Sequence, residues 1–298
     1  MNPKFHGNVF KMAIESLHSN HDRIYGSNRF VYPVLSRRSN GVSLGVNLNP
    51  DKVCNFDCIY CQVDRTSHSE TRFVEIDQLL SELRATLAFI TSGDFFGDGP
   101  FKDIPVELKR LNDIAFSGDG EPTTYKNFDE IISKCASLKR ELGLSDVKMV
   151  LITNASMFHR DHVKAGLRIF DENQGEIWAK LEAGTEAYFQ TIDRTTFKLQ
   201  EIVDNISEAA RYRSIVIQSL FMNVKGIAPS DEELLAFCGR LSEVVAAGGT
   251  IDHVQVYTVA RPPAESYVTA LPNTKVDQIV ALVQEQTGLA AVPYYGIS

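Results

Sequence analysis

The sequence has little cysteine and no long apolar run, and both absences restrict what the chain can be. It holds five cysteines in 298 residues, far below the density of a disulfide-stapled secreted domain. No apolar stretch approaches the roughly 20 residues that a membrane-spanning helix needs. The polar N-terminus lacks the apolar core of a signal peptide. We therefore expect a cytoplasmic protein without membrane contact, in which clustered thiols more often bind metal or carry out redox chemistry.

An excess of positive charge is also missing. The net charge is −8, with 44% hydrophobic and 23% charged residues, which is the composition of an ordinary globular protein. This balance argues against a purely electrostatic nucleic-acid binder. One segment, residues 23–38, is nevertheless basic, and its arginines are Arg23, Arg29, Arg37 and Arg38. The segment is either a solvated surface or a site for phosphate or carboxylate.

Neither an internal repeat nor a low-complexity tract is visible, and strand-like apolar runs alternate with helical patterns. The apolar runs predict strands at 41–49, 111–118, 147–153, 176–183, 214–221 and 253–260. The helical patterns lie at 75–91, 127–142, 159–170, 199–212, 230–247 and 274–287. Strand–helix units in series predict a parallel sheet with right-handed crossovers.

Six such units are too few for the closed barrel of eight strands. We therefore predict an α/β fold, a partial (β/α)6 TIM-like barrel with its site at the C-terminal strand ends. A doubly wound sheet is the alternative. The chain divides into an N-terminal helical and irregular extension (1–40), with an opening helix at about 8–19, and a core domain (41–298).

Three of the five cysteines fall within eight residues. Cys54, Cys58 and Cys61 have the spacing C-x3-C-x2-C and follow the first predicted strand. Three thiolates in one loop can converge on a soft metal centre, either zinc or an iron–sulfur cluster. Zinc needs a fourth ligand, for which His68 is the nearest later histidine. A cubane cluster is usually held by four cysteines, so three would leave one iron open for an exogenous molecule.

The loop "CNFDCIYC", with the aromatic Tyr60 before its last cysteine, resembles the cluster loop of the radical S-adenosylmethionine (SAM) superfamily. The resemblance implies that the three cysteines hold a [4Fe–4S] cluster whose open iron is chelated by SAM. It implies that one electron cleaves SAM to methionine and a 5′-deoxyadenosyl radical, which abstracts hydrogen from a substrate. The protein then positions the cofactor against the substrate and excludes solvent. An electron donor of flavodoxin or ferredoxin type is implied as well.

Polar residues at the following strand ends fit this resemblance. "FSGDGEPTT" (116–124) resembles the Gly-Gly-Glu motif for the SAM ammonium, which carbonyls and a carboxylate suit. "LITNAS" (151–156) resembles Thr-Asn-Gly, with Ala155 in place of the glycine. Lys180 and Glu182 share one strand face. A tight turn, a polar strand cap and a structural ion pair are the respective alternatives. The implied SAM contacts are Tyr60, Ser117, Gly118, Asp119, Gly120, Glu121, Asn154, Lys180 and Glu182.

Four other polar residues are candidates for substrate contacts: Arg37, Arg38, Gln218 and Arg261. The three arginines suit an anionic group such as phosphate or carboxylate. Gln218 lies within an apolar run, so its amide either faces the cavity or bonds within the core.

Longer stretches resemble one group of the superfamily, the Fe–S oxidoreductases related to the wyosine-base tRNA synthases. The stretches are 32–66, "FSGDGEPT", "KLEAGT" and "VQVYTVARPP". Those synthases carry a second cluster on additional N-terminal cysteines, but no cysteine precedes Cys54 here. Cys135 and Cys238 lie isolated on helical patterns, where we expect small buried hydrophobes. We therefore expect one cluster, the core of this group and an unassigned substrate.

Two other functions stay open. One is a wyosine-type or other RNA-modifying radical SAM enzyme, with the basic segment 23–38 as its RNA footprint. The other is a non-enzymatic zinc or iron–sulfur protein. The resemblance leaves open whether the enzyme is an oxidoreductase or a transferase.

Overall fold

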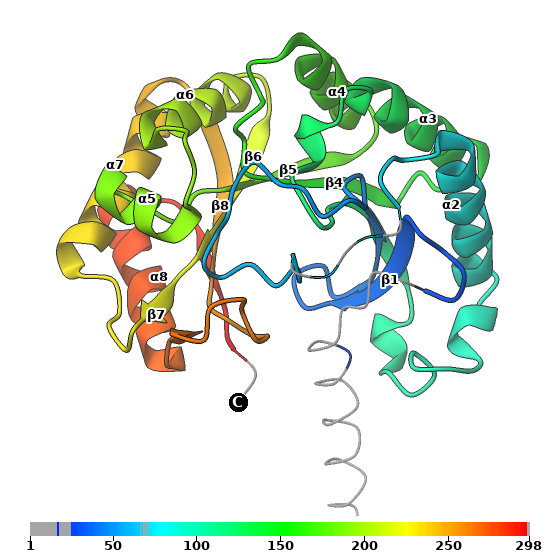
Figure 1. Ribbon diagram of the computed structural model, residues 1–298, viewed down its shortest axis with the longest axis horizontal. Coiled ribbons are helices and arrows are strands. Elements are labelled where there is room, and N and C mark those ends of the chain that lie inside the picture. The colour runs from blue at the N-terminus through cyan, green and yellow to red at the C-terminus, as the bar shows by residue number, and fades with distance from the viewer. Residues whose placement is uncertain (1–16, 18–24, 66, 68, 70, 297–298) are drawn as a thin grey trace, which may run out of the picture.

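Helices surround a curved sheet in this molecule (Figure 1). The computed structural model describes residues 17, 25–65, 67, 69 and 71–296. Arg23, His68 and nearly all of the opening helix predicted at 8–19 lie outside the described residues. Within the part of the chain that is described, no helix is long and apolar enough to span a bilayer.

In the described residues, eight strands form one sheet in the order β1-β2-β3-β4-β5-β6-β8-β10. Every neighbouring pair is parallel except β1 and β2, which form an antiparallel hairpin. The strands are β1 (Val31–Ser36), β2 (Gly41–Val46), β3 (Leu111–Phe116), β4 (Lys148–Thr153), β5 (Gly175–Lys180), β6 (Ser214–Leu220), β8 (Thr250–Tyr257) and β10 (Ala291–Tyr294). A separate antiparallel pair joins β7 (Met222–Val224) to β9 (Val268–Ala270).

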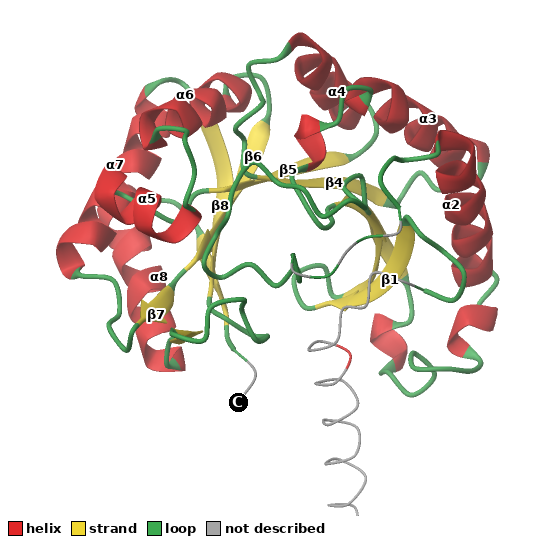
Figure 2. Ribbon diagram, viewed as in Figure 1, coloured by secondary structure: helices red, strands yellow, loops and turns green. Residues whose placement is uncertain are grey.

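The helices cover the outer face of the sheet (Figure 2). They are α2 (Ile76–Thr91), α3 (Phe128–Glu141), α4 (Asp161–Asp171), α5 (Glu186–Asp193), α6 (Leu199–Ala210), α7 (Asp231–Ala246) and α8 (Asn273–Thr287). Short 3-10 turns lie at η1 (Asp94–Phe96), η2 (Val106–Leu108) and η3 (Pro122–Thr124). Ser230 caps α7 by accepting from the Glu233 amide at 3.2 Å, and Gly143 follows α3 with a left-handed φ of 68°. Both features agree with helix limits readable in the sequence.

The apolar residues form two clusters, because alternate strand residues face opposite sides of the sheet. The large cluster fills the space between strands and helices. The small one lies inside the barrel, where Ala115, Val150, Trp178 and Val216 pack together. This arrangement confirms the predicted partial barrel, and all six predicted strands and all six predicted helices are present.

The segment before residue 41 differs from the prediction. Val31–Ser36, expected to be irregular, form β1 and pair with β2. The boundary placed between 40 and 41 therefore falls inside a hairpin, while the division into domains stays a prediction. Both edge strands hold a proline, Pro33 and Pro293, which weakens a strand signal and suits an edge. The gap between the edges is bridged by Arg37, which donates to the Tyr295 carbonyl at 2.5 Å.

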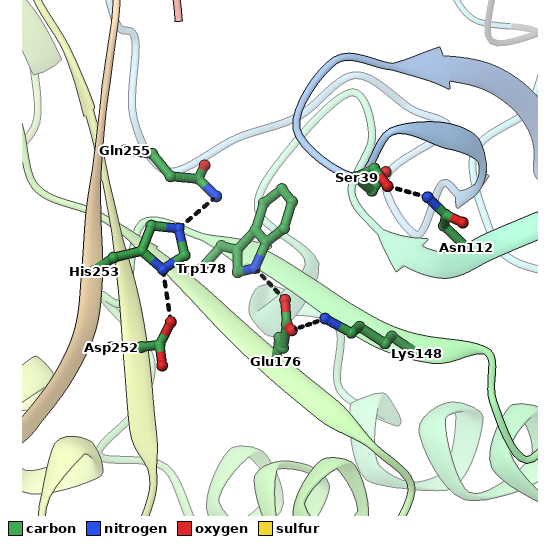
Figure 3. A network of polar contacts seen from close by, with 8 residues as sticks. All are labelled: Ser39, Asn112, Lys148, Glu176, Trp178, Asp252, His253 and Gln255. Atoms are coloured by element: carbon green, nitrogen blue, oxygen red, sulfur yellow. Dashed lines mark hydrogen bonds and ion pairs between the residues drawn. The ribbon is translucent and has the colours of Figure 1, made fainter. Parts of the chain in front are cut away.

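The N-terminal ends of the strands form a polar floor inside the barrel (Figure 3). Glu176 forms an ion pair with Lys148 and accepts from the Trp178 indole nitrogen at 3.0 Å. On β8, His253 contacts Asp252 at 2.6 Å. These contacts fix the indole ring of Trp178 in the middle of the barrel.

The Glu82 carboxylate on α2 accepts hydrogen bonds from the backbone at the start of β1. Glu82 accepts from the backbone amides of Arg29, Phe30 and Val31 at 3.0, 2.8 and 3.2 Å. Its side chain is buried with the residue 8% exposed. Glu82 is therefore the acceptor for three successive backbone amides.

We predict that Glu82→Ala lowers the free energy of unfolding by about 2–4 kcal/mol, because it orphans buried donors. Glu285→Ala, an exposed change on α8, should stay within about 0.5 kcal/mol of the parent. Urea denaturation of both variants measures the difference. Equal stability of the two variants would contradict this role of Glu82.

Candidate active site

One cavity of about 270 Å³ lies inside the barrel. It extends from the loop after β2, at the C-terminal strand ends, to the turn between β1 and β2. Every residue that the sequence indicated as a metal, SAM or substrate contact lines it. The fold thus brings together side chains that lie as far apart in the sequence as Arg37 and Arg261.

The cysteine loop is held in place by contacts that involve no thiol. The amides of Asp57 and Ile59 donate to the Asp193 and Ile192 carbonyls at the end of α5, at 3.1 and 2.8 Å. On the other side, the Ala264 amide donates to the Cys61 carbonyl at 2.8 Å. The loop is therefore fixed between α5 and the segment after β8.

The three thiols lie in a partly buried, charged environment. Burial, with the Asp193 carboxylate next in importance, raises the pKa of the Cys58 thiol well above its usual value. The Arg65 guanidinium donates to the Cys61 sulfur at 3.5 Å. Burial alone would lower the pKa of Lys180, but Tyr257 and the three thiols raise it. Two cations therefore face the thiols.

This donor set suits a cubane cluster better than a zinc ion. Among the described residues, no group of three His, Cys, Asp or Glu side chains is arranged to hold a single metal ion. In a cubane each cysteine binds a different iron, so the thiols need not converge on one point. Thiolates are ligands for both metals, and the nearby cations offset their charge.

Two buried carboxyls share the hydroxyl of Tyr60. It donates to Glu182 and contacts Asp193 at 3.4 Å. Burial raises the pKa of Asp193 to about 7, and burial followed by Asp193 raises that of Glu182 well above its usual value. The Lys180 ammonium lies 5.9 Å from the Tyr60 ring centre. Among the described residues no ion pair joins Lys180 to Glu182, so the structural-pair alternative is wrong.

The two glycines of the Gly-Asp-Gly-Glu stretch after β3 lie close to the loop after β2. A Cβ at Gly118 would lie 2.1 Å from the Asn47 amide oxygen, and one at Gly120 would lie 2.2 Å from the Val53 carbonyl. The two glycines therefore allow close approach to the chain's own loop after β2. Asn47 also donates to the Asp119 carboxylate at 2.7 Å.

Glu121 holds the ends of β3 and β4 together. Its carboxylate accepts from the Asn154 amide at 2.7 Å, the Thr153 hydroxyl at 2.6 Å and the Thr123 amide at 3.1 Å. The Thr123 hydroxyl is a fourth donor. Since a carboxylate has about four acceptor positions, these contacts use its capacity. The sequence did not reveal this role, because two of the four donors, from Thr153 and Asn154, lie at the end of β4.

Asn154 connects β4 to the cysteine loop. Its amide nitrogen donates to Asn55, the residue after Cys54, at 2.9 Å, and its oxygen accepts from the Ser156 hydroxyl at 2.6 Å. Ala155 follows at a left-handed φ of 60°, the conformation that glycine adopts without strain. The alanine thus keeps the backbone shape of the Thr-Asn-Gly sequence.

The four substrate candidates have different surroundings. Arg37 bridges the sheet edges to the Tyr295 carbonyl. Arg38 enters the cavity toward aromatic rings. Gln218 both lines the cavity and donates to Gln255 at 2.9 Å, so its two expected roles coexist. The Arg261 carbonyl accepts from Gln62, beside the last clustered cysteine, at 3.4 Å.

The other two cysteines are buried, as expected. Cys135 is 0% and Cys238 3% exposed. Burial raises the pKa of the Cys135 thiol to about 12. Both are therefore core side chains away from the cavity.

Comparisons with known proteins identify relatives along most of the chain. The family model described as the Radical SAM superfamily matches residues 48–238. A UPF0026 protein of Methanocaldococcus jannaschii is 27% identical over 274 residues, 89% of this chain and 74% of that protein. A UPF0026 protein of Helicobacter pylori is 26% identical over 235 residues, 77% of this chain and 66% of that protein.

A longer protein of Brachyspira hyodysenteriae, described as GTPase Obg, is 25% identical over 252 residues. The match covers 83% of this chain but only 32% of that protein, so the chain spans about a third of its length. No glycine stands directly before a lysine in the present sequence. The phosphate-binding G-x4-G-K-[ST] loop of such GTPases is therefore missing from it.

Two solved structures share the fold. TYW1 with a lysine–pyruvate adduct bound has a TM-score of 0.52 and 12% identity, covering 96% of this chain and 90% of its own. Streptococcus suis SuiB bound to S-adenosylmethionine has a TM-score of 0.52 and 14% identity, covering 88% of this chain and 49% of its own. At this identity the likeness concerns the barrel itself.

We predict that Ala155→Gly changes the free energy of unfolding by less than about 0.5 kcal/mol. Relief of about 1–2 kcal/mol of left-handed strain offsets the lost methyl burial and the added freedom of the unfolded chain, each about 0.5–1 kcal/mol. Ala183→Gly, at a buried alanine without positive φ, should cost about 1–2 kcal/mol. Urea denaturation compares them, and equal losses would refute strain at Ala155.

Proposed function

Because the chain belongs to the radical SAM superfamily, whose members are enzymes that use a [4Fe–4S] cluster and SAM, we propose that Cys54, Cys58 and Cys61 ligate that cluster here. The enzyme would cleave SAM reductively and abstract hydrogen from a substrate. The observation that carries the proposal is that one cavity holds the three thiols together with every expected SAM contact.

When bound, the reduced cluster supplies the electron that cleaves SAM to methionine and a 5′-deoxyadenosyl radical. The chain's own residues prepare the site. The hydrogen bonds to α5 hold the cysteine loop in place. Arg65 and Lys180 place positive charge beside the thiols, which favours their deprotonated, metal-binding form.

SAM would occupy the cavity next to the cluster loop. Its carboxylate would bind the buried Lys180 ammonium, and its ribose would lie near Glu182. The ammonium would bind the 117–120 segment, where Asp119 supplies the negative charge. Glu121 and Asn154, whose polar atoms are already hydrogen-bonded within the protein, would position these strand ends.

Members of the superfamily need an electron donor. We propose a flavodoxin or ferredoxin type of donor and a cytoplasmic location, where the clustered thiols stay reduced. An RNA substrate has less support, since the net charge is −8 and RNA binding depends on positive charge. Whether the reaction is an oxidation or a group transfer depends on the substrate.

The cysteine variants test the cluster assignment. Cys58→Ala should lower bound iron and sulfide several-fold and reduce 5′-deoxyadenosine formation from SAM at least about 100-fold, because one ligand of the open cluster is lost. The assay uses anaerobically reconstituted protein with dithionite. Cys135→Ala, which removes a buried thiol elsewhere, should keep both readouts near the parent level. Full cluster content in Cys58→Ala would refute the ligand set.

The buried lysine tests the SAM orientation. Lys180→Met keeps the length of the side chain but removes the ammonium, so it should raise the dissociation constant for SAM at least about tenfold while iron content stays unchanged. Equilibrium dialysis with labelled SAM measures the affinity. Lys164→Met, which removes an exposed ammonium paired with Glu208, is the control. Unchanged affinity in Lys180→Met would remove Lys180 from the SAM site.

A further inference from the structure

We propose that the end of the cavity away from the cysteines is an oxyanion subsite, in which Arg38 binds a carboxylate or phosphate group of a small substrate. The inference rests on the proposed function in one respect, since it takes this cavity to be the active site. It adds to that function the chemical class of the substrate and the residue that recognises it.

Arg38 reaches the barrel interior from the turn between β1 and β2. Its guanidinium carbon lies 5.6 Å from the ring centre of Trp178 on β5 and 5.2 Å from that of Tyr257 on β8. The indole nitrogen of Trp178 is already bonded to Glu176, as Figure 3 shows. The ring is therefore held in place as a fixed wall of the subsite.

The charge of Arg38 has no counter-ion in the described part of the chain. No carboxylate there lies within ion-pair distance of it, whereas four other arginines have carboxylates at 2.6–3.0 Å: Arg84, Arg194, Arg213 and Arg240. A partly buried guanidinium without an anion is unfavourable, and cation–π contacts offset only part of that cost. An anion arriving from solution would complete the site.

The donors of Arg38 also remain available. A guanidinium carries five N–H groups, and the Tyr257 hydroxyl, whose pKa Arg38 lowers, can accept from only one or two of them. The faces of the aromatic rings attract the charge of the guanidinium, but they do not accept hydrogen bonds from the N–H groups that lie in its plane. The paired oxygens of a carboxylate or phosphate match the fork of the guanidinium.

Neighbouring cations strengthen the preference for an anion. Burial raises the pKa of Tyr257 and Glu182 adds to that rise, while Lys180 and Arg38 both lower it, so two positive charges act on the phenol. In the proposed function Lys180 binds the carboxylate of SAM, which leaves Arg38 for a second acidic group. Arg37 does not compete for that group, because it donates to Tyr295 at the sheet edge.

The size of the cavity limits the ligand. Its volume of about 270 Å³ lies just below the range typical of ligand sites. A small acid, or the small acidic end of a larger molecule, suits a cavity of this size.

Trp178 provides a direct readout, because it is the one tryptophan of the chain. The experiment titrates the holoenzyme, without SAM or reductant, with inorganic phosphate and separately with acetate at constant ionic strength, and follows tryptophan fluorescence. We expect a saturable change with at least one anion, and the stronger response distinguishes a phosphate from a carboxylate substrate. Arg38→Met should raise that dissociation constant at least tenfold.

Two further variants complete the test. Arg38→Lys keeps the charge but not the fork, so its affinity should fall between those of the parent and Arg38→Met. Arg168→Met, which removes an exposed charge on α4, should bind as the parent does. No saturable response to either anion, or equal affinity in Arg38→Met, would overturn the proposal. If Arg38→Met does not fold, equal affinity in Arg38→Lys overturns it.

The titration is independent of SAM cleavage. A protein that binds the anion through Arg38 but forms no 5′-deoxyadenosine would keep the subsite and contradict the proposed function. A protein that cleaves SAM but shows no Arg38-dependent anion response would keep the function and remove the subsite.

Discussion

The position of the cysteine loop depends on two backbone hydrogen bonds, from Asp57 and Ile59 to the end of α5. They hold in place the loop whose three thiols line the cavity. Because the carboxyl ends of parallel strands meet at one edge of the sheet, the polar residues after β3, β4 and β5 then face the thiols. The barrel thus serves as a frame for one site.

The barrel interior is more polar than a packed core, and its charged side chains do not all form ion pairs with one another. Glu182 and Asp193 share the hydroxyl of Tyr60, whereas Lys180 and Arg38 have no carboxylate partner among the described residues. Such burial of charge is costly unless a ligand compensates it. These two cations without a carboxylate partner are therefore consistent with a cavity that binds anionic molecules.

Much of this was readable from the sequence, because strand and helix periods and the cysteine spacing are local signals. Five of the strands and helices were not. β1 contains Pro33 and lies in a basic segment, α5 has only eight residues, and β7, β9 and β10 have three or four residues each. The hydrogen-bonding role of Glu121 was not predicted, and the sequence did not distinguish the surroundings of Arg38 from those of Arg37. In each case the partners come from other strands and loops.

The central claim is that three cysteines hold a cluster whose open iron binds SAM inside this cavity. The most direct measurement is the electron paramagnetic resonance spectrum of the reduced holoprotein with and without SAM. The account predicts a [4Fe–4S] signal that shifts when SAM is added. A spectrum that SAM leaves unchanged, in protein with full iron and sulfide content, would contradict it.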